Sequence, residues 1–187
     1  MTRTRVLAVL GAAALLAGCS TTPDEPEVQP QAQSTLTACP AQPENPAAGD
    51  PLSELSFDCP AGGTLDLGRA QGVPTLVNLW GSWCPPCREE MPLLQELSAS
   101  AGGKLQVVGV ISKDGQPQAE SFAADAGVTF PSAFDGDGEL MADLGINVLP
   151  YTYFLDASGS LVYTQVGPVE SVDELRGLVA EHLGVRL

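Results

Sequence analysis

Basic residues are scarce in this 187-residue chain, in which 8 lysines and arginines stand against 23 aspartates and glutamates. The formal net charge of −15 and the scattered basic positions leave no positive stripe for phosphates, which argues against a nucleic-acid partner. Histidine occurs once, at His182, where it is expected at the surface. Only one closely spaced cysteine pair, Cys84 and Cys87, is present, so the sequence predicts no metal site.

Residues 1–18 have the pattern of an export signal. Arg3 and Arg5 precede the apolar stretch "VLAVLGAAALLAG", which is too short to span a membrane comfortably, and Cys19 follows at once. Leu16-Ala17-Gly18-Cys19 resembles the bacterial lipobox, which implies that Cys19 is lipidated and becomes the first residue of a lipoprotein. We therefore expect a lipid-anchored protein at the cell membrane, facing outside the cytoplasm; ordinary secretion or an uncleaved anchor is the alternative.

Residues 19–51 differ in composition from the rest of the chain. They contain seven prolines and no apolar periodicity, which is typical of a segment that cannot bury enough surface to fold. We expect a stiff tether here, followed by one domain over residues 52–187. The hydrophobic content of 44% is sufficient for a core in that domain.

The two remaining cysteines, Cys39 and Cys59, are left over once Cys19 is lipidated and Cys84 pairs with Cys87. An even remainder in an oxidising compartment favours a second disulfide between them. Their flanks, "TACPAQ" and "SFDCPAGG", carry no helix start that would activate a thiol, so we interpret this bond as structural. A regulatory or resolving role is the alternative.

The order of predicted elements indicates an α/β protein. An N-terminal hairpin is expected from "LSFDC" and "TLDL", and the continuous apolar run "TLVNLW" predicts a central strand. Helices and strands then alternate: we expect helices over 85–100 (interrupted at Pro92), 118–126, 139–144 and 171–183, and strands over 105–112, 151–156 and 160–167.

The stretch "LWGSWCPPCREEMP" places two cysteines at the junction between the central strand and a helix. A helix N-terminus presents unpaired backbone N–H groups and a positive dipole end to Cys84, which favours its thiolate. Pro86 is harmless in the first turn, and Cys87 follows one turn later on the same face, so a disulfide between the cysteines is local. A zinc half-site and an inert staple are the alternatives.

These residues resemble the thioredoxin-like family, and specifically the TlpA/ResA-type membrane-anchored thiol:disulfide oxidoreductases. The resemblance rests on "VNLWGSWCPPCREEMP", on "VLPYTYFLD" and on the helical insertion from about Gln116 to Gly127. It implies a thioredoxin fold, in which a central mixed sheet is flanked by helices, with an N-terminal hairpin and a helical insertion in the middle.

The resemblance also implies roles for individual residues. Cys84 matches the exposed nucleophile and Cys87 the buried resolving thiol, while Pro150 matches a cis-proline whose backbone groups meet an extended substrate. Four further residues are expected to touch the substrate: Trp83, Pro85, Pro86 and Leu149.

Proton transfer needs a group other than the buried aspartate of cytosolic thioredoxins, because Asn78 stands at that position. Glu90 lies three residues after Cys87 on the same helix and matches the acidic residue of ResA-like proteins. In apolar surroundings its pKa would rise, so it could accept the Cys87 proton. Alternatively, Glu89 and Glu90 only complement the helix dipole.

The predicted activity is the reduction of disulfides in exported proteins, which for ResA-like members includes apocytochrome c. The electrons would be carried by Cys84 and Cys87 without a bound cofactor, in a monomer that a membrane thiol-transfer partner recycles. A disulfide-forming oxidant and a non-catalytic tethered binding module are the alternatives. A thiol peroxidase is disfavoured, because Gly81 stands where peroxiredoxins carry a threonine.

Overall fold

The computed structural model describes residues 34–187. The predicted signal peptide, Cys19 and the first part of the predicted tether lie outside the described residues. Among residues 34–187, none of the helices has the length and apolar character needed to cross a bilayer.

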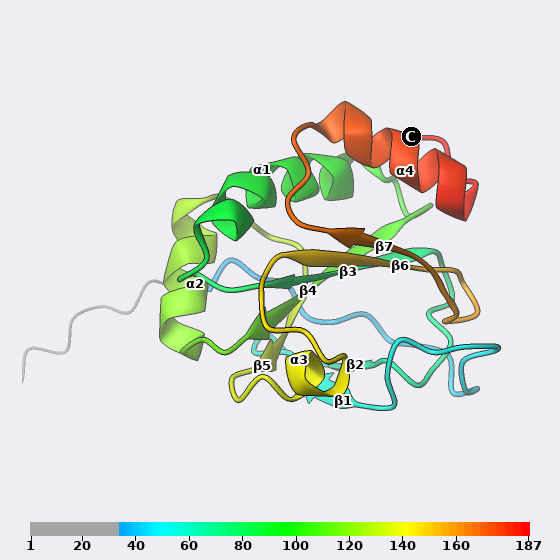
Figure 1. Cartoon of the computed structure of the whole chain (residues 1–187), viewed down its shortest axis with the longest axis horizontal. Coiled ribbons are helices and arrows are strands. Elements are labelled where there is room, and N and C mark those ends of the chain that lie inside the picture. The colour runs from blue at the N-terminus through cyan, green and yellow to red at the C-terminus, as the bar shows by residue number, and fades with distance from the viewer. Residues whose placement is uncertain (1–33) are drawn as a thin grey trace, which may run out of the picture. The chain divides into compact units, whose positions relative to one another are not determined.

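The described residues form a small hairpin and a larger sheet with four helices (Figure 1). In chain order the elements are β1 (Ser56–Asp58), β2 (Thr64–Asp66), β3 (Thr75–Trp80), α1 (Pro85–Ser100), β4 (Gln106–Ser112), α2 (Gln116–Asp125), β5 (Ser132–Asp135), α3 (Glu139–Asp143), β6 (Tyr151–Leu155), β7 (Leu161–Val166) and α4 (Val172–Leu183).

The larger sheet is mixed, with the strand order β5-β4-β3-β6-β7. Strands β3, β4 and β5 run parallel, whereas β6 pairs antiparallel with both β3 and β7. Every residue of β3 is buried, as its continuous apolar run predicts for a central strand. This arrangement confirms the predicted thioredoxin-like α/β fold.

Alternate residues of β3 face two separate apolar clusters. Leu76 and Trp80 pack with residues of α1, α2 and α4, whereas Val77 and Leu79 pack with α3 and the β1–β2 hairpin. Figure 1 shows α1 and α4 above the sheet, with α3 and the hairpin below it. Asn78 shares the parity of Leu76 and Trp80 and is therefore on the α1 side.

Two features of the fold differ from the prediction. Strand β5 was not expected, because four residues of mixed character give no periodic signal; it forms by pairing with β4, where Gly109 lies opposite Ser132. Helix α1 continues through Pro92 without interruption. The missing proline N–H costs one helix hydrogen bond, but the buried neighbours Met91 and Leu94 keep the helix packed on the core.

The prediction of a free tether is wrong for residues 34–51, which lie against the domain. Leu36 is buried in the cluster on the α1 side, and the Thr37 N–H donates to a carbonyl in the loop after α2. Cys39 is bonded to Cys59, with 5.9 Å between their Cα atoms, as the cysteine count predicted. The sequence shows no periodicity here because backbone hydrogen bonds and one disulfide, rather than a helix or strand face, hold the segment.

Candidate active site

Cys84 and Cys87 form a disulfide at the N-terminus of α1. Their Cα atoms lie 5.3 Å apart, and Cys84 is the N-cap residue. The Cys87 N–H donates to the Cys84 sulfur at 3.3 Å, and the Cys84 N–H donates to the Gly81 carbonyl at 3.1 Å. The redox pair is therefore held within one helical turn by its own backbone.

The two prolines between the cysteines reduce the number of donors at this helix end. Pro85 and Pro86 occupy the first two helical positions and have no N–H. The Cys87 N–H is thus the one first-turn amide that faces the Cys84 sulfur, rather than the several unpaired groups expected from the motif alone. Charge on this sulfur would receive less hydrogen-bond stabilisation than at a helix start without prolines.

Cys84 was expected to be exposed, but only 2% of it is accessible, and Cys87 is fully buried. In this disulfide-bonded form both belong to the apolar cluster on the α1 side. The adjacent Trp83 is 50% exposed. Its indole lies over Gly81, where an added Cβ would come within 2.6 Å of the indole nitrogen. An exposed aromatic ring therefore lies beside the loop that leads into Cys84.

The peptide bond between Leu149 and Pro150 is cis, as predicted. Strand β6 begins at the next residue, Tyr151, which lies opposite Leu79 near the end of β3, so Pro150 comes to the edge of the sheet where the cysteines begin. The Pro150 carbonyl accepts a hydrogen bond from Gly167 at 3.1 Å. Within residues 34–187 the backbone N–H and C=O of Leu149 have no such partner.

Exposed apolar side chains gather at the same edge of the sheet. Val148 is 57% and Val166 is 61% exposed, and Val166 lies opposite Tyr151 in the register of β6 and β7. Together with Trp83 and the half-buried Leu149 they make an apolar rim at the edge of the sheet where the cysteines begin. The sequence analysis missed both valines. Val148 could have been found because it is next to Leu149 in the sequence. Val166 reaches this edge of the sheet only because β7 pairs with β6.

Glu90 is buried and turned toward the sheet. Asn78 donates to one carboxyl oxygen at 2.8 Å, and the Val169 N–H donates to the other at 3.2 Å. Burial raises the pKa of Glu90 from 4.5 to about 7, and the two hydrogen bonds limit this rise. Glu89, in contrast, is exposed. The alternative that both acids merely complement the helix dipole is therefore wrong for Glu90.

Asn78 links the carboxyl group of Glu90 to the sheet. Its amide nitrogen also donates to the Thr152 hydroxyl on β6 at 3.0 Å. The amide oxygen of Asn78 is buried and has no hydrogen-bond partner among residues 34–187. This unpaired acceptor beside the carboxyl group can accept a hydrogen bond from a donor such as a water molecule.

Asp114 is a further residue that the sequence analysis missed. Its carboxylate accepts hydrogen bonds from the backbone N–H groups of Ser82 and Gly115, and so ties the loop before Cys84 to the loop after β4. The strand order could have indicated Asp114, because β3 and β4 are parallel and the loops that follow them meet at one edge of the sheet.

The other predicted residues lie away from this edge. The Cys39–Cys59 bond belongs to the apolar cluster on the hairpin side of the sheet, opposite the cluster that holds Cys84 and Cys87. His182 is half-buried rather than on the surface, because it stacks on the Tyr163 ring at 3.8 Å. Across residues 34–187 no three His, Cys, Asp or Glu side chains are grouped to hold a metal ion.

Comparisons with known proteins agree with this geometry. The redoxin family pattern matches residues 47–179. The thiol:disulfide interchange protein DsbE of Escherichia coli K12 is 41% identical over 98 residues, which cover 52% of this chain and 51% of that protein. The chain thus spans about half the length of that relative. The thioredoxin-like protein YneN of Bacillus subtilis is 34% identical over 122 residues, covering 64% of this chain and 71% of that protein.

Solved structures give the same result for the fold. The crystal structure of a DsbF homologue from Corynebacterium diphtheriae has a TM-score of 0.61 and 30% identity, and the match covers 70% of this chain and 85% of that chain. The fold, the disulfide at the start of α1 and the matched family pattern lead to one conclusion. The chain belongs to the redoxin family, in the thioredoxin-like group that includes the DsbE-type thiol:disulfide interchange proteins.

Proposed function

We propose that this protein is an extracytoplasmic thiol:disulfide oxidoreductase that reduces disulfides of exported proteins, and that apocytochromes c are among its targets. The observation that carries the proposal is the Cys84–Cys87 disulfide at the N-terminus of α1, next to the edge where Leu149 has free backbone groups. Relatives named as thiol:disulfide interchange proteins support it.

In the proposed reaction the Cys84 thiolate attacks a sulfur of the substrate disulfide, and the other substrate sulfur leaves as a thiolate. Cys87 then loses its proton to Glu90 and attacks the Cys84 sulfur, which releases the second substrate thiolate. The substrate gains two electrons and the protein ends as the Cys84–Cys87 disulfide. A carboxyl group with a pKa of about 7 is suited to this step, because it can both accept and return a proton near neutral pH.

Reduction is favoured over oxidation by the donors around Cys84. A dithiol becomes a strong oxidant when its reduced form is stabilised, mainly as a thiolate. Pro85 and Pro86 remove two N–H groups that would provide such stabilisation, which leaves the Cys87 amide as the first-turn donor to the sulfur. The reduced form is then less stable than it would be at a helix start without these prolines, so the dithiol donates electrons more readily.

The proposed substrate contacts are made by the apolar rim and by the backbone of Leu149. Trp83 presents an exposed ring beside Cys84, and Pro85 is exposed while Pro86 is half-buried at the start of α1. An extended substrate segment would pair with the free N–H and C=O of Leu149.

The proposed setting follows from the N-terminal sequence. Lipidation of Cys19 would hold a monomer at the outer face of the cell membrane, where a membrane thiol-transfer partner restores the dithiol. The chain would need no metal or bound cofactor, because the cysteine pair itself carries the two electrons.

The test is the reduction of insulin disulfides by the purified protein in the presence of dithiothreitol, followed by titration of the Cys84/Cys87 couple against glutathione. We expect catalysis that Cys84→Ser abolishes, and a potential well below that of glutathione. Absence of catalysis would contradict the oxidoreductase. Catalysis with a potential above that of glutathione would support the disulfide-forming oxidant instead.

A further inference from the structure

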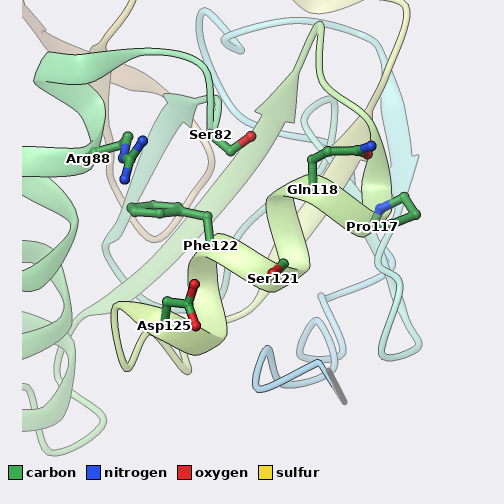
Figure 2. A pocket seen from close by; sticks show the side chains of 7 residues that line it. All are labelled: Ser82, Arg88, Pro117, Gln118, Ser121, Phe122 and Asp125. Atoms are coloured by element: carbon green, nitrogen blue, oxygen red, sulfur yellow. The ribbon is translucent and has the colours of Figure 1, made fainter. Parts of the chain in front are cut away.

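A pocket of about 410 Å³ lies between the start of α1 and the inserted helix α2. Figure 2 shows its walls, with Ser82 and Arg88 on the side of the redox pair and Ser121, Phe122 and Asp125 on α2. None of these residues has a part in the chemistry described above. The pocket is open, is lined by both polar and apolar side chains, and begins two residues before Cys84.

Arg88 is the distinctive group of this pocket. Its guanidinium lies over the Phe122 ring, 5.1 Å from the ring centre, and Figure 2 shows the two side chains facing one another. Arg88 is the only basic residue of α1 and α2. Among residues 34–187, its guanidinium has no ion pair, although the chain is strongly acidic. The guanidinium thus lies over an aromatic ring and is not held in an ion pair by any carboxylate of the described residues.

The position of Arg88 relates the pocket to the reacting sulfur. Arg88 follows Cys84 by four residues, so the two lie on the same side of α1, about 6 Å apart along the helix axis. An extended chain advances about 3.3 Å per residue. A partner segment bonded at Cys84 therefore reaches Arg88 with a side chain two or three residues from its own cysteine.

We infer that this pocket receives an acidic side chain of the partner polypeptide, located two or three residues from the cysteine that reacts with Cys84, and that Arg88 binds its carboxylate. The inference deepens the proposed function and rests on it. Ser82 and Ser121 add hydroxyl groups to the lining of the same pocket. Asp125, one turn beyond Phe122 on α2, also lines the pocket and adds a negative charge there, which disfavours a second acidic residue.

The test uses three synthetic disulfide peptides that differ only in the residue two positions from the cysteine, which is Glu, Gln or Lys. Rates of reduction are measured for the parent, for Arg88→Gln and for Arg186→Gln. Arg186 is exposed and follows α4, away from α2, so this control removes the same charge at a remote site. Rate ratios between peptides cancel any change in the reactivity of Cys84 itself.

We expect the parent and Arg186→Gln to reduce the Glu peptide about two- to fivefold faster than the Gln peptide, the range expected for an exposed ion pair, and the Lys peptide slowest. Arg88→Gln should no longer show this order of reduction rates among the three peptides. Equal rates for all peptides with the parent, or the same preference in Arg88→Gln, would overturn the inference while leaving the proposed function intact.

A second measurement needs no exchange reaction. Peptides with serine in place of cysteine are titrated into the oxidised, ¹⁵N-labelled protein, and the amide signals of Ser82, Ser121 and Phe122 are followed. We expect these signals to shift with the Glu peptide and to shift less in Arg88→Gln. Such shifts without any disulfide reduction would support the pocket and contradict the oxidoreductase, whereas no difference between Glu and Gln peptides would overturn the inference.

Discussion

Replacing Glu90 with glutamine should remove the loss of stability that the parent undergoes as the pH rises. Glu90 is fully buried, and its carboxylate accepts hydrogen bonds from Asn78 and Val169. Glutamine keeps the size of the side chain but cannot become charged. It also brings an NH₂ group that must face one of the two donors, which costs about 1 kcal/mol at every pH.

The magnitude follows from the pKa of Glu90, which burial raises from 4.5 to about 7 in the folded protein. Below pH 4.5 the carboxyl group is protonated in both the folded and the unfolded chain, so no penalty exists. Between pH 4.5 and about 7 the unfolded chain releases the proton first, and stability falls by about 1.4 kcal/mol per pH unit. The folded parent therefore loses about 3 kcal/mol in total, and none of this loss occurs in Glu90→Gln.

The assay is urea unfolding of the oxidised proteins at pH 5, 6, 7 and 8, with both disulfides intact. Glu90→Gln should be about as stable as the parent at pH 5, where the parent has already lost about 0.8 kcal/mol, and more stable by about 2 kcal/mol at pH 8. Burial also raises the pKa of Asp135, but that group is present in both proteins, so the difference between them isolates Glu90. Parallel stability curves for the two proteins would refute the reasoning.

Three further outcomes are expected. Cys39→Ser combined with Cys59→Ser should lower the free energy of unfolding in urea by about 3 kcal/mol, because the bond closes a loop of 20 residues. Insulin reduction should continue in this double variant, and lost activity at unchanged stability would make this pair catalytic. Trp83→Ala should raise KM for a protein disulfide roughly tenfold and leave the rate with a small aromatic disulfide unchanged, and equal losses with both would contradict a docking role. Cys19→Ala should abolish labelling by radioactive palmitate, whereas continued labelling and processing would contradict lipidation.

The sequence predicted the elements whose signals are local. The strand expected from the continuous apolar run of β3 and the helix expected over 171–183 were both found where expected. The short strand β5 could not be predicted, because it exists only through pairing with β4. Residues 34–51 were misjudged for the same reason, since long-range backbone hydrogen bonds and the Cys39–Cys59 bond leave no periodic pattern.

The same division applies to the candidate site. Cys84, Cys87 and the cis bond before Pro150 were predicted from motifs that lie within a few residues of each other. The hydrogen bond from Val169 to Glu90 joins residues 79 positions apart, and Val166 reaches the rim through strand pairing, so neither could be found from local spacing.

The central claim is that Cys84 is the attacking sulfur and that Cys87 resolves the bond it forms. The direct measurement is peptide mapping by mass spectrometry, without reduction, after Cys87→Ser has reacted with a protein disulfide substrate. The account predicts a stable mixed disulfide between the substrate and Cys84, with the Cys39–Cys59 bond unchanged. An adduct on Cys39 or Cys59, or the absence of any adduct when the parent protein reduces the same substrate, would contradict it.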